Sequence, residues 1–353
     1  MWQIRPGLDS IKSYYVPDIA WPVKLDANER AEALPPAVQA RIAERLTAIA
    51  GNRYPEIGQH SLKKALAVGL GLEPENIALG NGSSEVLAAI CRVFGGVGRK
   101  IVYPHPSFSM YKIYCRLADS EPLTVELDAG FALAPEKVFT TALQEQAGLI
   151  ILCNPNNPTG GAMSLEAVEY IVAGARCPVV VDEAYGEFAG QSALPLLGKY
   201  PNLIVARTFS KAYGLAAARV GYAAAGKEII AAIGKVLLPY HINAFSLAAA
   251  ETAWEMRSEF ALGIVRTMAE RERVAANLRE MSAVEVFPSA TNFLLLRSSR
   301  AKELADYLAA RGVGVRDFSA APALAGCLRV TVGTAAENDL FLAATGKFIR
   351  GEV

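Results

Sequence analysis

Residues 203–223 read LIVARTFSKAYGLAAARVGYA, and this stretch decides the fold. The runs Leu203–Arg207 and Val220–Ala223 are apolar at nearly every position rather than at every second one, which is typical of strands buried on both faces of a sheet. Lys211 lies just beyond the first run among small residues, although most lysines lie on protein surfaces. A desolvated lysine is a better nucleophile than an exposed one, so Lys211 is a candidate for chemistry.

The same alternation of apolar runs and helical stretches extends from about residue 60 to residue 250. It predicts an α/β fold with a mostly parallel sheet flanked by helices. A single long helical stretch is predicted at 251–281, and a further helix at 36–50. The other predicted strands are Ile77–Leu79, Lys100–Tyr103, Leu149–Cys153, Pro178–Val181, Val284–Phe287, Asn292–Leu296, Val313–Arg316 and Leu328–Val332.

The last third of the chain has shorter strand candidates, with helices predicted at 300–311 and 335–349. Thr334 and Glu337 have the spacing of a capping box for the last helix. This pattern predicts a smaller α+β domain, joined by the N-terminal arm. We therefore expect residues 1–50 to form an N-terminal arm and part of the small domain, residues 51–255 a large ligand-binding domain, and residues 256–353 a small C-terminal domain.

The composition narrows the classes of function. The 353 residues carry 35 Lys and Arg against 35 Asp and Glu, so bulk charge does not favour binding to nucleic acid or to an acidic membrane. The five cysteines contain no C-x-x-C motif, and the three histidines lie far apart, so we expect reduced thiols and no metal site. The N-terminus has no signal-peptide pattern and no apolar run is long enough for a membrane span, which predicts a cytoplasmic protein.

Polar motifs follow the predicted strands, where ligands bind in open parallel sheets. GNGSSE (80–85) follows Ile77–Leu79 and leads into a helix with Ser83 or Ser84 expected at its N-cap. The free N–H groups there suit a phosphate, although an ordinary capped turn explains the motif equally well. NPNNPTG (154–160) is either a plain loop or a rigid turn that presents Asn157 to a ligand.

Asp182 and Arg219 complete the set of strand-end groups. Asp182 follows Pro178–Val181, and a carboxylate at the end of a central strand needs a cationic partner, such as a protonated heterocyclic nitrogen, unless it is solvated. Arg219 lies eight positions after Lys211 and can bind a phosphate in bidentate geometry. A phosphate site, an Asn, an Asp and a Lys at successive strand ends are the parts that a pyridoxal phosphate site needs.

Over nearly its whole length, the chain resembles the fold-type I aminotransferases that depend on pyridoxal phosphate, and among them the histidinol-phosphate aminotransferases. It departs from their usual pattern at Arg30-Ala31 (usually Asn-Pro), at Ser84 (often Asp) and at Phe108 (often Tyr). The motifs that carry the resemblance are LDANE (25–29), NRYPE (52–56), GNGSSE (80–85), NPNNPTG (154–160), VDEAY (181–185), RTFSKAYGL with RVGY (207–222), and VRDFS with LAGCLRVTVGT (315–334).

The resemblance implies a role for each matched residue. Lys211 is expected to carry pyridoxal phosphate as a Schiff base and to move the proton, while Asp182 pairs with the pyridine nitrogen. Tyr185 and Asn157 are expected to hydrogen-bond the phenolic oxygen of the cofactor, and Phe108 to stack on its ring. The expected phosphate ligands are Gly82, Ser83, Ser84, Ser210, Arg219 and, from the neighbouring subunit of a homodimer, Tyr54.

The resemblance also implies a reaction, which is transamination between L-histidinol phosphate and 2-oxoglutarate to give imidazole-acetol phosphate and L-glutamate in histidine biosynthesis. The expected substrate ligands are Arg316, Arg329, Tyr15 and Asn28, although Arg316 could instead be a surface arginine at a strand end. Three alternatives remain open. They are a lyase similar to threonine-phosphate decarboxylase, an aromatic amino-acid aminotransferase, and a regulatory binding protein with an aminotransferase-like domain.

Overall fold

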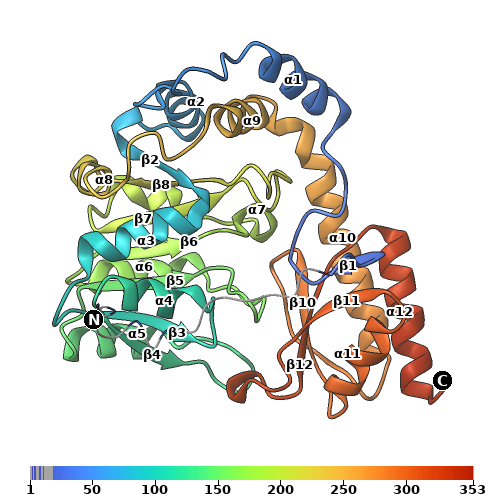
Figure 1. Ribbon diagram of the computed structural model, residues 1–353. Coiled ribbons are helices and arrows are strands. Elements are labelled where there is room, and N and C mark those ends of the chain that lie inside the picture. The colour runs from blue at the N-terminus through green and yellow to red at the C-terminus, as the bar shows by residue number, and fades with distance from the viewer. Residues whose placement is uncertain (1, 3, 5–7, 9–10, 12–18, 353) are drawn as a thin grey trace.

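The computed structural model describes residues 2, 4, 8, 11 and 19–352. Its larger sheet has the strand order β2-β8-β7-β6-β5-β3-β4 (Figure 1). Strand β8 runs antiparallel to both of its neighbours, and the other pairs are parallel, so the predicted mostly parallel sheet is confirmed. The strands are β2 Ile77–Asn81, β3 Lys100–His105, β4 Glu121–Glu126, β5 Leu149–Cys153, β6 Val179–Asp182, β7 Leu203–Thr208 and β8 Val220–Ala225.

Helices cover both faces of this sheet, because its strands alternate their side chains between two apolar cores. In β7, Leu203 and Val205 pack on the side of α5 and α6, whereas Ile204 and Ala206 pack on the side of α3, α4 and α8. Burial on both faces explains the continuous apolar runs in the sequence. The helices are α2 His60–Leu70, α3 Gly82–Phe94, α4 Met110–Leu117, α5 Pro135–Gln144, α6 Leu165–Gly174, α7 Gly186–Ala189, α8 Lys227–Gly234 and α9 Ala244–Glu255.

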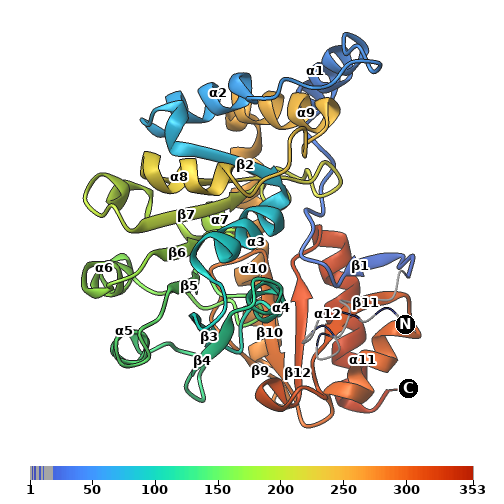
Figure 2. The same ribbon diagram turned by 60° about the vertical axis from the view of Figure 1, so that its left-hand side comes forward.

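A second, five-stranded sheet has the order β1-β11-β12-β10-β9 and packs with three helices beside the large sheet (Figure 2). Strand β1 pairs in parallel with β11, so the N-terminal segment adds a strand to this second sheet. Thr334 and Glu337 form the predicted capping box of α12. The elements are β1 Val23–Leu25, β9 Glu285–Val286, β10 Phe293–Arg297, β11 Val313–Asp317, β12 Cys327–Thr331, α10 Ala261–Arg279, α11 Ala301–Ala309 and α12 Ala335–Arg350.

The prediction of one long helix at 251–281 is wrong. Helix α9 ends at Glu255, and a 3-10 turn at Arg257–Phe260 leads into α10. Trp254 and Phe260 are both buried in the same core, although a continuous helix would point them about 120° apart around its axis. The turn therefore lets both rings reach one core.

Two strands were not predicted from the sequence. Strand β4 is a half-exposed edge strand that contains Pro122, and such a strand has neither an apolar run nor a clean alternation. Strand β1 has only three residues. The helix α1 Pro36–Thr47 packs against α9 through the core that contains Val38 and Ile42, so the stretch 1–50 contributes to both parts of the molecule. The domain boundaries themselves stay a prediction.

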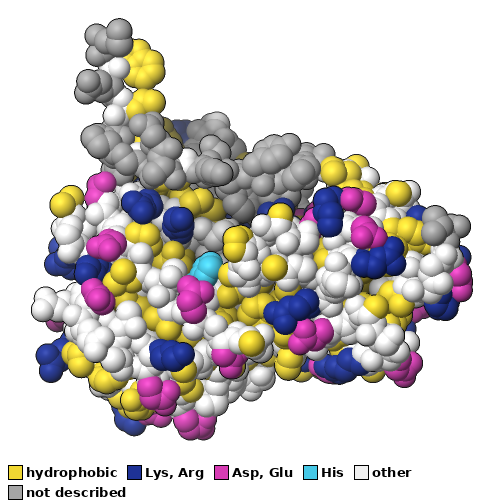
Figure 3. All heavy atoms as spheres, turned by 90° about the horizontal axis from the view of Figure 1, so that it is seen from below, with side chains coloured by type: hydrophobic (Ala, Val, Ile, Leu, Met, Phe, Trp, Pro, Cys, Tyr) yellow, Lys and Arg dark blue, Asp and Glu magenta, His cyan; other side chains and the backbone are white. Residues whose placement is uncertain are grey.

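The surface carries both signs of charge. On the face shown in Figure 3, basic and acidic side chains are interspersed, in agreement with a formal net charge of zero. Within the described part of the chain, no helix is both long and apolar enough to cross a membrane.

Gly221 permits a close approach between β8 and the start of α3. A Cβ atom at this position would lie 2.2 Å from the backbone nitrogen of Ser83, which cannot rotate away. We expect Gly221→Ala to lower the free energy of unfolding by about 2 kcal/mol or more, measured by chemical denaturation. Gly226→Ala is the control, because its nearest neighbour would be 3.7 Å away. Similar, small effects of both substitutions would contradict the close approach.

Candidate functional site

A cavity of about 710 Å³ lies between the carboxyl ends of the large-sheet strands and the small sheet. Residues that follow β1, β5 and β7 or end β6 line it together with residues of β11 and β12. The sequence-predicted residues that line it are Asn28, Ser83, Ser84, Phe108, Asn157, Asp182, Tyr185, Ser210, Lys211, Arg219, Arg316 and Arg329.

Three predicted site residues are not among those that line the cavity: Gly82, which adjoins the lining residue Ser83, Tyr54 and Tyr15. Tyr54 is 81% exposed and stacks on Tyr240 with ring centroids 4.6 Å apart, and it does not line the cavity. Tyr15 is among the residues that the structure does not describe.

The turn from β2 into α3 forms one end of the cavity. Gly82 has φ +77°, and a Cβ atom there would lie 2.8 Å from Nη2 of Arg219. Helix α3 begins at Gly82 with Asn81 as its N-cap residue, so the expected N-cap at Ser83 or Ser84 is wrong. As a glycine, Gly82 can adopt this positive φ, so the helix can begin at residue 82 rather than after one of the two serines. No side chain caps this end, so the first N–H groups of α3 are available to an anion.

Arg219 is held in place beside this helix terminus. Its φ of +53° is uncommon for a residue with a side chain. Its Nη1 donates to Oγ of Ser210 at 3.3 Å and to the carbonyl of Ala216 at 3.1 Å. A guanidinium group, a serine hydroxyl and the N-terminus of a helix thus converge, as expected for a phosphate site.

Asp182 is buried at the end of β6, with 3% of its surface exposed. Its Oδ2 accepts a hydrogen bond from the Tyr111 hydroxyl at 2.7 Å, and its Oδ1 accepts one from the backbone of Ala184 at 3.2 Å. Burial raises the pKa of Asp182 to about 6, against the lowering effect of these two hydrogen bonds. Among the residues of the described chain, no cation pairs with this carboxylate. The cationic partner that the sequence required is therefore left to a ligand.

Lys211 lies beyond the end of β7 and is partly buried. Its Nζ donates to the carbonyl of Ala27 at 3.1 Å. Burial, followed by the charge of Arg329, lowers the pKa of Lys211 to about 7. A substantial fraction of this amine is neutral near pH 7, so it can act as a nucleophile and as a base.

Tyr185 and Asn157 approach the cavity from neighbouring strand ends. The Tyr185 hydroxyl accepts a hydrogen bond from Nδ2 of Asn28 at 2.9 Å, and burial raises its pKa to about 12. Oδ1 of Asn157 accepts a hydrogen bond from Nη1 of Arg329 at 2.7 Å. Phe108 meets Tyr111 edge-on, with ring centroids 5.5 Å apart, and this contact sets the plane of its ring.

Two arginines form the small-domain side of the cavity. Arg316 of β11 and Arg329 of β12 are direct cross-strand partners, and both guanidinium groups lie 5.8 Å from the Phe318 ring. Like charges directly opposite on two strands are destabilising unless an anion lies between or beside them. Since Arg316 lines the cavity, it is not a surface strand-end arginine.

Sequence reasoning missed some of the residues that shape the cavity. Tyr111 and Ala27 hold the carboxylate of Asp182 and the amine of Lys211, but they lie 71 and 184 residues away from them in the chain. The one available signal was the short spacing between Phe108, which precedes α4, and Tyr111 in its first turn.

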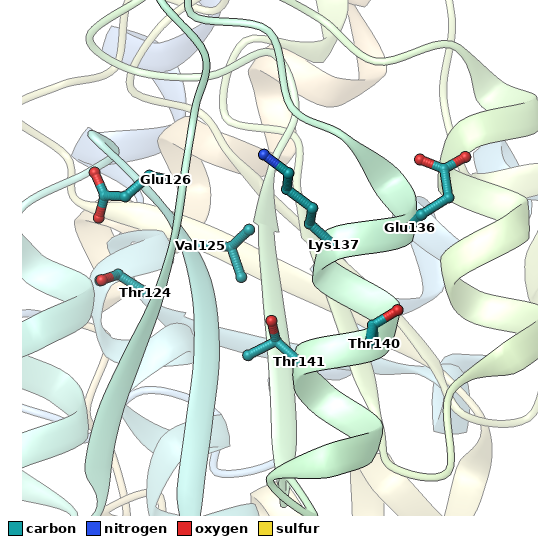
Figure 4. Close-up of a pocket in the computed structure, with 7 residues that line it drawn as sticks. All are labelled: Thr124, Val125, Glu126, Glu136, Lys137, Thr140 and Thr141. Carbon is teal, nitrogen blue, oxygen red and sulfur yellow. The ribbon is translucent and has the colours of Figure 1, made fainter.

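A second hollow of about 420 Å³ lies between β4 and α5 and shares no residue with the larger cavity (Figure 4). Its lining of Thr, Glu and Lys side chains is typical of a solvated surface. Among the described residues, no cluster of three or more His, Cys, Asp or Glu has the arrangement of a metal site.

The sequence pattern of the family described as aminotransferase class I and II matches residues 22–344. The chain belongs to this family. A histidinol-phosphate aminotransferase of Ruminiclostridium cellulolyticum is 36% identical over 343 residues, which cover 96% of each chain. This aminotransferase is therefore an enzyme with transferase activity between an amino donor and a 2-oxoacid, and the non-enzymatic alternative is not supported.

Solved structures share the same fold. The structure of histidinol-phosphate aminotransferase from Sinorhizobium meliloti in complex with pyridoxal-5'-phosphate matches this aminotransferase with a TM-score of 0.91 at 28% identity, covering 100% of this chain and 99% of that one. L-threonine-O-3-phosphate decarboxylase from Porphyromonas gingivalis matches with a TM-score of 0.81 at 26% identity, covering 93% and 99%. The fold-type I architecture expected from the sequence is thereby confirmed.

The burial of Asp182 makes the stability of the cofactor-free protein depend on pH. Folding raises the pKa of Asp182 from 3.8 to about 6, so its contribution to stability is complete below pH 4 and is lost as the pH rises through 6. Asp182→Asn has no ionisable group at this position, so the variant does not lose this stability as the pH rises. We expect the free energy of unfolding of the variant, relative to wild type, to increase by about 3 kcal/mol between pH 4 and pH 8, measured by chemical denaturation.

The exposed substitution Asp306→Asn on α11 serves as the control for this measurement. Asp306→Asn should leave the pH dependence of unfolding as it is in the wild type, because the exposed ion pair of Asp306 with Lys302 contributes little to stability. A pH dependence of Asp182→Asn identical to that of the wild type would show that Asp182 is ionised in the folded protein at no cost.

Proposed function

We propose that this aminotransferase uses pyridoxal phosphate to transfer the amino group of L-histidinol phosphate to 2-oxoglutarate, giving imidazole-acetol phosphate and L-glutamate. The observation that carries the proposal is one cavity with Lys211, a buried Asp182 that lacks a cation among the described residues, and the facing arginines Arg316 and Arg329. The similarity to histidinol-phosphate aminotransferases over nearly the whole chain supports the choice of substrate. The proposed location is the cytoplasm.

The residues present fit pyridoxal phosphate. Asp182 would pair with the protonated pyridine nitrogen, which is the cation that its burial requires. The phosphate would lie at the start of α3, held by Ser83, Ser84, Ser210 and Arg219, in a cradle where a Cβ atom on Gly82 would collide with Arg219. When bound, this cofactor supplies an electron sink that stabilises negative charge on the substrate carbon.

The side chains around the cofactor site would each do a separate task. Lys211 would hold the cofactor and then, as a neutral amine with a pKa of about 7, take a proton from the substrate carbon and deliver it at the other end of the 1,3-proton shift that transamination requires. The Tyr185 hydroxyl and the Asn157 amide would hydrogen-bond the phenolic oxygen, with Tyr185 oriented by Asn28. Phe108 would stack on the ring, because its contact with Tyr111 fixes the ring plane.

The paired arginines would select the substrate. A phosphate dianion next to Arg316 and Arg329 would offset the repulsion between two guanidinium groups on facing strands. The carboxylates of glutamate and 2-oxoglutarate would use the same groups in the second half of the reaction. Tyr15 and Asn28 are the other proposed substrate ligands, and Asn28 lies at the cavity wall.

We further propose a homodimer in which Tyr54 reaches the cofactor phosphate of the neighbouring subunit. Tyr54 lies outside the cavity of its own chain and is among the most exposed aromatic residues, close to exposed Ile57 and in stacking contact with Tyr240. An exposed apolar group of this kind suits a protein interface. The Tyr54 hydroxyl would complete a phosphate site to which Arg219 contributes a guanidinium group.

The central experiment is an assay with pyridoxal phosphate, L-histidinol phosphate and 2-oxoglutarate. We expect glutamate to form, and borohydride reduction followed by peptide mapping to find the pyridoxyl group on Lys211. Lys211→Ala should reduce glutamate formation by roughly a thousand-fold or more while weak cofactor binding remains. Lys63→Ala is the matched control, because Lys63 is also partly buried with a pKa lowered by burial but lies outside the cavity.

Two outcomes would contradict the proposal. The reduced cofactor could be found on another lysine, which would remove Lys211 from the chemistry. Release of carbon dioxide from phosphothreonine, with no glutamate from histidinol phosphate, would instead favour a decarboxylase, the activity that names the P. gingivalis structure.

Arg316 provides the test of substrate choice. We expect Arg316→Ala to raise the KM for histidinol phosphate roughly 10- to 100-fold, and to raise the KM for glutamate less, because the dianion loses more of its charge pairing. Arg297→Ala is the control, since Arg297 belongs to the same small sheet but does not line the cavity. Equal increases for both substrates would indicate that Arg316 is only structural.

A further inference from the structure

Residues 26–30, the linking segment, run between the two domains and contact the reactive groups of the large one. The carbonyl of Ala27 accepts the hydrogen bond from Nζ of Lys211 at 3.1 Å. Nδ2 of Asn28 donates to the hydroxyl of Tyr185 at 2.9 Å. The position of the Lys211 amine therefore depends on where the linking segment lies.

The same segment is attached to the small domain. Nη2 of Arg329 donates to the carbonyl of Asp26 at 2.8 Å, and the backbone of Asn28 donates to Oγ1 of Thr331 at 2.9 Å. The carbonyl of Asn28 accepts a third hydrogen bond from Nδ2 of Asn292 at 3.1 Å. A shift of the small domain would consequently be transmitted to the lysine through this backbone.

Arg30 ends the linking segment and inserts its side chain beside the turn that carries Lys211. Its side chain is only 9% exposed, and Nη1 donates to the carbonyl of Ala212 at 3.0 Å. Two glycines make room for it. A Cβ atom on Gly214 would lie 3.0 Å from Cδ of Arg30, and one on Gly263 would lie 2.1 Å from its Nη2.

An acidic side chain connects Arg30 to helix α10. Nη2 of Arg30 donates to Oε2 of Glu32 at 2.9 Å, and Glu32 accepts two hydrogen bonds from Arg266 at 2.9 and 3.0 Å. Helix α10 begins beside the large-domain core and ends in the small-domain core, and Figure 1 shows it extending from α9 toward the small domain. The chain of contacts therefore runs from the turn after Lys211 to a helix shared by both domains.

We propose that Arg30 is a positioning residue that holds the Lys211 turn against the linking segment and helix α10. The inference rests on the proposed function in so far as Lys211 is the lysine that reacts with the cofactor. Only a guanidinium group can donate to the Ala212 carbonyl and to Glu32 at once from a fixed planar fork.

The first measurement follows the turn itself. We expect Arg30→Met to speed hydrogen–deuterium exchange of peptides covering residues 209–215 in the cofactor-free protein about tenfold or more, because the Ala212 carbonyl loses its partner. Arg30→Lys should restore part of the protection, since it keeps one donor. Arg45→Met is the matched control, because Arg45 pairs with Glu255 in a similar way but far from Lys211.

The second measurement follows Lys211. Capture of pyridoxal phosphate, trapped with borohydride at a series of pH values, should have its midpoint near the lysine pKa of about 7 in the wild type. In Arg30→Met we expect this midpoint to rise, because a loosened turn admits water to the amine. In the complete enzyme, kcat should fall about tenfold while the KM for histidinol phosphate changes less than twofold, as Arg30 does not line the cavity.

Wild-type exchange and a wild-type capture midpoint in Arg30→Met would overturn the inference. If Arg30→Met fails to fold, Arg266→Met tests the same contacts from α10 and should also speed exchange in residues 209–215. Capture of the cofactor on a lysine other than Lys211 in the wild type would refute the proposed function alone. The exchange measurement would then still decide whether Arg30 holds this turn.

Discussion

A buried carboxylate with two neutral hydrogen-bond donors is the constraint on which the functional cavity depends. Asp182 ends a central strand of a sheet that is covered on both faces, so its side chain cannot reach bulk water. The hydroxyl of Tyr111 and the amide of Ala184 stabilise its ionised form, but burial outweighs them and raises the pKa to about 6. A buried carboxylate of this kind is costly by itself, and it becomes favourable when a cation binds beside it.

The basic residues of the cavity likewise carry charges that a ligand of the opposite sign would neutralise. Lys211, Arg219, Arg316 and Arg329 all line one cavity, and the charge of Arg329 contributes to the low pKa of Lys211. Burial, followed by the charges of Arg329 and Arg219, keeps the lysine amine partly neutral, as a nucleophile requires, and the arginines keep a preference for anions. A cofactor phosphate at α3 and a substrate dianion at the arginine pair would satisfy both groups at separate ends of the cavity.

Much of this cavity could be predicted from the sequence, because parallel strands bring their carboxyl ends to one edge of a sheet. The motifs that follow β2, β5, β6 and β7 meet there for that reason alone. The contacts that tune them could not be predicted in the same way. Ala27 and Lys211 lie 184 residues apart in the chain, and Arg30 and Ala212 lie 182 residues apart. Local periodicity in the sequence does not indicate contacts at such separations.

The errors in the predicted elements have a related cause. The break between α9 and α10 serves the burial of Trp254 and Phe260 in one core, a tertiary demand that overrides the helical pattern of the segment. The early start of α3 depends on the positive φ of Gly82, which in turn leaves the space that Arg219 occupies. In both places the local sequence permits more than one conformation, and the packing partner selects between them.

Stability and function are therefore opposed around this cavity. The burial of Asp182 and the placement of Arg316 opposite Arg329 oppose folding, whereas ligands that bind only to the folded chain add stability by mass action. The linking segment connects the two domains beside this cavity. It contacts Lys211 and Arg329 through the backbone carbonyls of Ala27 and Asp26, which carry no net charge. Arg30 adds a charged contact outside the cavity, where Glu32 neutralises it without disturbing the balance around Lys211.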